Sequence, residues 1–90
     1  MMDAPAHIEA ALSTETDCLA HAERAIATLG RGEIIVGIFP RGGFKSHAVA
    51  VVDGYVIDNG TLAGPAWRIF PARDLYRHME GFSCEPNCPF

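Results

Sequence analysis

Three side chains of this 90-residue chain could together break or form an amide bond. Cys18 carries a thiol, His47 an imidazole and Asp58 a carboxylate, in that chain order. A thiolate is a strong nucleophile, an imidazole can take the thiol proton, and a carboxylate can hold the imidazole in the tautomer that accepts it. We therefore treat Cys18, His47 and Asp58 as a candidate catalytic triad that transfers an acyl group through a thioester.

Each of these residues also has an ordinary structural role open to it. A cysteine at a helix start is often a small core residue, and a histidine on a strand often needs no function. Asp58 precedes Asn59 and Gly60, so it can simply prepare a turn. The combination favours function, because strand geometry independently brings His47 and Asp58 together.

Segment 46–59 predicts a β-hairpin. Asp53 and Gly54 lie between two apolar runs, which is typical of a type I′ turn. With these two residues as the loop, His47 and Asp58 share a face as diagonal neighbours, their backbones roughly 7–8 Å apart. We expect this face to pack against the helix that carries Cys18, because its other residues are apolar: Val49, Val51 and Val56.

Segment 18–29 predicts that helix. Its apolar residues recur at helical spacing, Gly30 should end it, and Thr14 or Thr16 should cap its start. A helix N-terminus lowers the pKa of a thiol and offers unpaired N–H groups to an oxyanion. A first-turn position therefore suits Cys18 as a nucleophile.

The remaining pattern predicts the α+β class in a single domain, 1–90. We expect a helical part at 4–29, an antiparallel sheet at 33–70, a short helix at 71–79 and an irregular tail at 80–90. The architecture expected is a central N-terminal helix packed on a small antiparallel sheet.

Composition narrows the function classes. The formal charge of −4 disfavours direct nucleic-acid binding, although an acidic surface can meet a basic protein partner. No apolar run approaches the roughly 20 residues of a membrane span, and the first ten residues lack the pattern of a secretion signal. We expect a cytoplasmic protein. The basic side chains, Arg68 among them, are spread out and are expected at the surface.

Other thiols and imidazoles are weaker candidates. Cys84 and Cys88 can form a disulfide, join His78 in a metal site, or remain free. We expect free thiols, no metal and no cofactor, since three nearby ligands fall short of the usual four for structural zinc. His21 follows Cys18 by three residues and is expected in solvent.

Residues 17–59 resemble the core of transglutaminase-like and papain-like cysteine enzymes. The resemblance is carried by TDCLAHAERAIATLG, EIIVGIF and SHAVAVVDGYVIDNG. It is strongest to the small bacterial branch, which includes bacterial transglutaminase-like cysteine peptidases and the leader peptidases of lasso-peptide pathways. It implies that Cys18 is the nucleophile, His47 the base and Asp58 the orienting acid. No glutamine or tryptophan precedes Cys18 as an oxyanion donor, and the hairpin register turns Asn59 to the opposite face.

Two functions from different classes follow. The first is a thiol enzyme, a cysteine peptidase, amidase or transamidase, acting on a peptide or protein substrate. The alternative is a non-catalytic, acidic binding or inhibitor protein of phage or mobile-element type on a degenerate version of the same fold. A homo-oligomer is also open, with Phe82, Phe90 and the tail covering an apolar patch.

Overall fold

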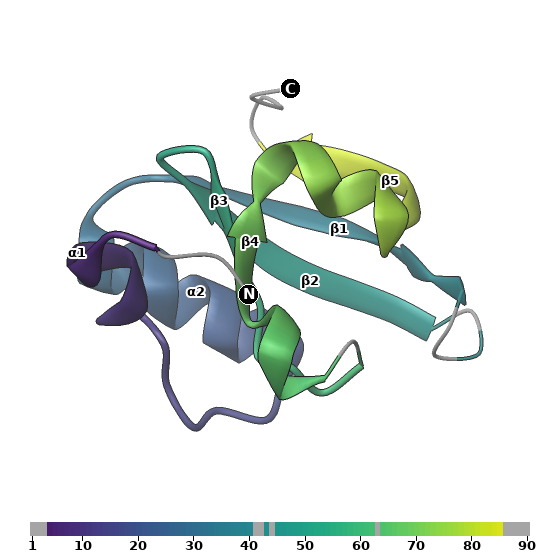
Figure 1. The fold of residues 1–90 in the computed structure, drawn as a ribbon. Coiled ribbons are helices and arrows are strands. Elements are labelled where there is room, and N and C mark those ends of the chain that lie inside the picture. Colours follow the sequence, from purple (N-terminus) through teal and green to yellow (C-terminus); the bar gives the residue numbers. More distant parts are fainter. Residues whose placement is uncertain (1–3, 41–42, 44, 63, 86–90) are drawn as a thin grey trace.

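The computed structural model describes residues 4–40, 43, 45–62 and 64–85 and is built around one five-stranded antiparallel sheet. The spatial order of the strands is β4-β3-β2-β1-β5. Helix α2 covers one face of the sheet and the short helix η3 lies on the other (Figure 1). This arrangement confirms the α+β class and the helix packed on an antiparallel sheet. The strands are β1 (Glu33–Phe39), β2 (Lys45–Val52), β3 (Tyr55–Ile57), β4 (Ile69–Pro71) and β5 (Glu80–Glu85).

The predicted helical region at 4–29 contains two helices. Helix α1 (Ala6–Glu9) has four residues and α2 (Cys18–Leu29) has twelve. The residues between them are rich in Ser, Thr and Asp, which bond their own backbone and favour caps over helix interiors. The central helix is therefore the second helix of the chain. The 3₁₀ helices η2 (Pro65–Trp67) and η3 (Ala72–Arg77) follow later, and η3 lies within the predicted helix at 71–79.

The β2–β3 hairpin has the predicted register. Val52 pairs with Tyr55, and the ladder continues through Ala50 and Ile57. Asp53 has φ 52° and Gly54 has φ 82°, the two positive values that a type I′ turn requires. A two-residue loop of this kind sets which side chains share a face along both strands.

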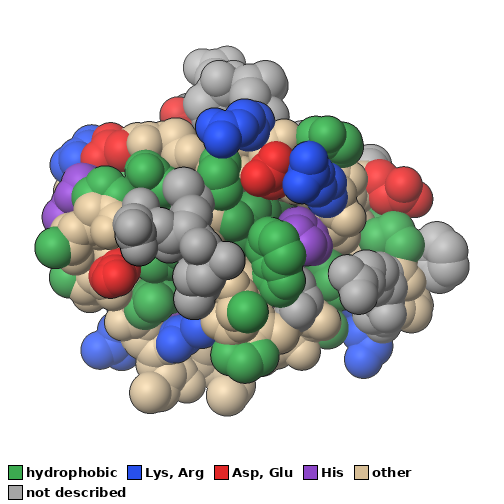
Figure 2. Space-filling view, viewed as in Figure 1, with side chains coloured by type: hydrophobic (Ala, Val, Ile, Leu, Met, Phe, Trp, Pro, Cys, Tyr) green, Lys and Arg blue, Asp and Glu red, His purple; other side chains and the backbone are tan. Residues whose placement is uncertain are grey.

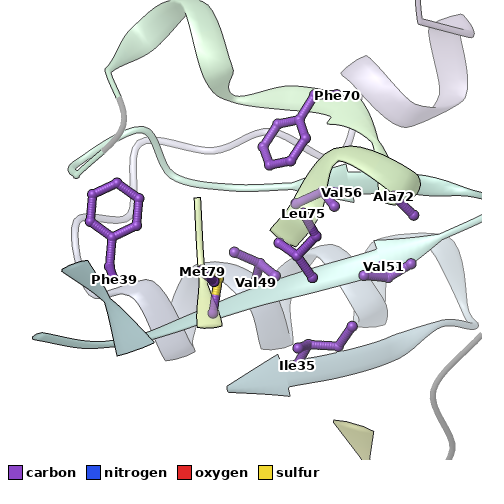
Figure 3. Close-up of a cluster of buried hydrophobic side chains, with 9 residues drawn as sticks. All are labelled: Ile35, Phe39, Val49, Val51, Val56, Phe70, Ala72, Leu75 and Met79. Carbon is purple, nitrogen blue, oxygen red and sulfur yellow. The ribbon is translucent and has the colours of Figure 1, made fainter. Parts of the chain in front are cut away.

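The two faces of the sheet have separate cores, and one prediction about them is wrong. The valine-rich face packs against Leu75 and Met79, not against α2, as Figure 3 shows for Leu75 above Val49 and Val51. The small side chains of the opposite face contact α2. An α-helix can approach a sheet closely where both carry small residues. The alanines of α2 and of β2 therefore favour packing of the helix on this face. The α2-side cluster contains Ala22, Ala25, Ala50, Val52 and Ile57.

The first half of the predicted irregular tail is a strand. β5 pairs with β1 through Ile34–Glu85, Ile35–Cys84 and Val36–Ser83, so the prediction for 80–85 is wrong, and 86–90 lies outside the described residues. The formation of β5 depends on its pairing with β1, which is distant in the sequence. Without β5, the outer edge of β1 would present unpaired backbone N–H and C=O groups, which a returning strand satisfies.

Candidate active site

His47 and Asp58 form a buried pair. His47 lies on β2, Asp58 directly follows β3, and the imidazole Nε2 is 2.7 Å from a carboxylate oxygen, Oδ1. Only 2% of His47 and 3% of Asp58 is exposed. The diagonal contact predicted from the hairpin register is therefore confirmed. A hydrogen bond this short and this well shielded from water fixes the orientation of the ring.

The surroundings of Asp58 favour one histidine tautomer. The N–H of Gly60 also points to Oδ1, at 3.4 Å, and the Asp58 N–H donates to the carbonyl of Arg68 at 2.8 Å. If Asp58 is a carboxylate, which only accepts hydrogen bonds, Nε2 of His47 is the donor to Oδ1. The lone pair of a neutral ring then lies on Nδ1. That nitrogen is the atom available as a base.

The sheet is incomplete beside His47. Strand β3 pairs with β2 only as far back as Ala50, so the earlier half of β2 has no strand partner on that side. The chain instead leaves β3 through Asp58 and Asn59.

Cys18 is the first residue of α2, as predicted, and is half-buried. The helix is capped by Asp17, whose side chain accepts a hydrogen bond from the Ala20 N–H at 2.9 Å, so the expected threonine cap is wrong. The start of α2 is held at the end of β3, because Asn59 Nδ2 donates to the carbonyl of Thr16 at 2.9 Å. Two residues span at most about 7 Å, so Cys18 lies near this contact.

The structure joins two of the three candidate residues and leaves the third apart. Helix α2 packs on the face opposite to His47, and the described residues show no hydrogen bond from the Cys18 thiol to His47 or Asp58. The sequence prediction placed all three on one face because it assigned α2 to the valine-rich side.

His21 and Arg68 are two residues that sequence reasoning misjudged. His21 is 1% exposed and accepts a hydrogen bond from the Ser13 N–H at 3.3 Å, so its expected place in solvent is wrong. Burial, followed by the charge of Arg68, lowers the pKa of His21. Arg68 is only partly exposed and donates to the Ser13 carbonyl. Helical spacing could have indicated the burial of His21, because it lies four positions before the buried Ala25, but no sequence pattern indicated the contact of Arg68.

Two depressions flank the start of α2. A polar one of about 250 Å³ is lined by the Ser13–Thr16 segment, Asn59, Thr61 and Arg68. An apolar one of about 400 Å³ lies between α2 and β1. The residues of the second depression include Leu19, Ile26, Ile34 and Val36.

Within the described part of the chain, no three His, Cys, Asp or Glu residues are grouped so that they could hold a metal ion. The structure does not describe the side chain of Cys84, and Cys88 lies outside the described residues, so the prediction that both thiols are free remains a prediction.

Comparisons with protein-family models, with curated proteins and with solved structures found no match to this chain. Among the described residues, no helix has both the length and the apolar character needed to cross a bilayer.

Proposed function

We propose that this chain is a thiol enzyme acting on amide bonds of a peptide or protein. The observation that carries the proposal is the buried hydrogen bond between His47 and Asp58. This bond fixes the orientation of the imidazole, which a general base requires. Two features support it: Cys18 opens a helix whose start is tied to the residue after Asp58, and residues 17–59 resemble cysteine enzymes of the transglutaminase-like and papain-like type.

The reaction follows from the roles of the three side chains. Nδ1 of His47 takes the Cys18 proton as the sulfur attacks the carbonyl carbon. The tetrahedral intermediate collapses as the C–N bond breaks, and the imidazolium gives its proton to the leaving amine. A thioester on Cys18 remains. Water then attacks it to complete hydrolysis, or an amine attacks it to complete transamidation, with His47 again taking the proton of the attacking group.

The first turn of α2 supplies donors for the oxyanion of the intermediate. The first N–H groups of a helix have no partner within the helix. The Ala20 N–H is taken by the Asp17 side chain, which leaves the N–H groups of Cys18 and Leu19. Backbone donors beside the reacting sulfur stabilise the charge that develops during attack. Because Asn59 uses its side-chain amide to hold Thr16, it does not serve this role.

A specific observation favours a second candidate, a non-catalytic binding protein. Helix α2 lies on the opposite face from His47, and the deep burial of the imidazole is also what a structural pair would show. The formal charge of −4 would suit a basic partner. On the side of the molecule shown in Figure 2, acidic and basic side chains are interspersed rather than separated by sign, so this side is not a single acidic docking surface.

Alkylation of Cys18 separates the two candidates. The experiment uses a Cys84→Ser, Cys88→Ser background, so that Cys18 is the only thiol, and iodoacetamide as the probe. We expect the folded chain to react at neutral pH about tenfold or more faster than the same chain unfolded in urea, because a positioned base promotes formation of the thiolate. His47→Ala should abolish the difference. His7→Ala, which removes an exposed histidine, should not.

The outcome that contradicts the enzyme is a Cys18 that reacts no faster folded than unfolded, with His47→Ala without effect. An additional measurement concerns the thioester. Incubation with a mixture of unstructured peptides, followed by hydroxylamine, should release hydroxamates from the wild type and none from Cys18→Ala. Hydroxamate formation that persists in Cys18→Ala would exclude Cys18 as the nucleophile.

A further inference from the structure

Three side chains hold the segment that leads into Cys18. His21 accepts from the Ser13 N–H, Arg68 donates to the Ser13 carbonyl, and Asn59 donates to the Thr16 carbonyl. The first two contacts hold the same residue, five positions before Cys18. The contact from Asn59 is the only one of the three within two positions of Cys18, so it bears most directly on where the thiol lies.

Both ends of the Asn59 side chain are in use. Nδ2 donates to the Thr16 carbonyl at 2.9 Å, while Oδ1 accepts from the backbone N–H of Thr61 at 3.1 Å and from its hydroxyl at 2.9 Å. The two contacts with Thr61 orient the amide, because Oδ1 can accept and Nδ2 can only donate. Thr61 therefore aims Nδ2 at the segment before α2.

Asn59 also stands next to the other half of the candidate site. It follows Asp58 directly, and Asp58 bonds His47 at 2.7 Å. A short path thus runs from the thiol to the imidazole, through Thr16, the Asn59 amide and the Asp58 carboxylate. Without the Asn59 amide, the hydrogen-bonded link between the segment before α2 and the hairpin is lost, and of the three contacts described above only the two at Ser13 remain.

We infer that Asn59 is a positioning residue that holds the start of α2, and with it Cys18, against the strand end that carries Asp58. The inference rests on the proposed thiol enzyme. Asn59 touches neither substrate nor sulfur in this role. It acts by fixing the separation between α2, which packs on one face of the sheet, and the end of β3, where Asp58 bonds His47.

The test is the pH profile of Cys18 alkylation by iodoacetamide, in the Cys84→Ser, Cys88→Ser background. Asn59→Ala removes the donor to Thr16, and we expect its profile to move toward that of the same chain unfolded in urea. Thr61→Val removes the hydroxyl contact but keeps the backbone N–H that also orients Asn59, so it should move the profile less than Asn59→Ala does. A purely structural role for Asn59 would lower the melting temperature without moving the profile.

Asn59→Asp gives a second variant if Asn59→Ala does not fold by circular dichroism. A carboxylate keeps the acceptor for Thr61 but cannot donate to Thr16. Thr61→Asp is the control for the added negative charge, because it places a carboxylate nearby and leaves Asn59 unchanged. We expect Asn59→Asp to move the profile further than Thr61→Asp does, and equal movement in the two would mean that charge alone acts, which overturns the inference.

The comparison with His47→Ala separates failure of the inference from failure of the proposed function. A changed profile in His47→Ala with an unchanged profile in the folded Asn59 variant overturns the positioning role and leaves the thiol enzyme standing. An unchanged profile in His47→Ala removes the proposed function and the inference with it.

Discussion

At the scale of single residues, the burial of His47 and Asp58 carries a large desolvation cost. An imidazole and a carboxylate have been removed from water almost completely, and each is tolerated there because the other satisfies it. Such a pair adds little net stability, but the loss of one partner leaves the other buried and unsatisfied. The pair is thus a feature that function can explain, whereas packing alone would favour apolar residues at both positions.

Asp58→Ala should therefore destabilise the fold even if the protein has no catalytic activity. The expected loss is about 1–3 kcal/mol of the free energy of unfolding, because the His47 ring and the Gly60 N–H both lose their acceptor. Urea unfolding followed by circular dichroism measures it. The control is Asp74→Ala, which removes an exposed contact with Arg77 at 3.8 Å and should cost less than about 0.5 kcal/mol. Equal losses in the two variants would contradict the buried pair.

At the scale of elements, the connection between α1 and α2 is held by contacts that depend on a neutral histidine. His21 can accept from the Ser13 N–H only while its ring keeps a lone pair. Protonation would remove that acceptor and place a cation near the Arg68 guanidinium, although the Asp58 and Glu15 carboxylates favour the charged ring. Burial is the largest effect, and the pKa of His21 is lowered.

The sign of the resulting pH dependence follows from linkage. Because the pKa of His21 is lower in the folded chain than its unfolded value of 6.5, the unfolded state binds more protons as the pH falls below that value. Stability should be full above pH 6.5 and fall toward the lowered folded pKa. His21→Gln keeps an acceptor for Ser13 but cannot titrate, so its urea midpoint should fall less between neutral and mildly acidic pH. His7→Gln is the control, and a wild-type slope in His21→Gln would refute the assignment.

At the scale of the whole molecule, one carboxylate joins three separate parts of the chain. Asp53 in the hairpin turn is hydrogen-bonded to His7 of α1 at 2.9 Å. It also accepts from Arg31, which lies between α2 and β1, with Nε of Arg31 at 3.0 Å. Hydrogen bonding from Arg31, and then from His7, lowers the pKa of Asp53 to about 2. The short helix α1 is thereby linked to the turn that sets the register of the hairpin.

The contribution of this cluster should disappear in acid. The folded pKa of Asp53 lies below its ordinary value of 3.8, so its stabilisation is present above that pH and is lost as the pH falls toward about 2. Asp53→Asn removes the charge and keeps a residue that suits a type I′ turn. Thermal unfolding should show a smaller difference in melting temperature between the wild type and Asp53→Asn at acid pH than at neutral pH. A difference independent of pH would mean that Asp53 acts through the turn alone.

The sequence by itself determined the local geometry of this protein. The Asp53–Gly54 turn, the β2–β3 register, the helix that begins at Cys18 and the meeting of His47 with Asp58 all follow from side-chain alternation and turn chemistry within a short stretch of chain. Only the tertiary structure decided which face of the sheet α2 would cover, that β5 would return to the edge of β1, and that Arg68 would reach Ser13. These outcomes depend on how distant surfaces fit and which edges need partners, and periodicity along a single strand or helix carries no information about either.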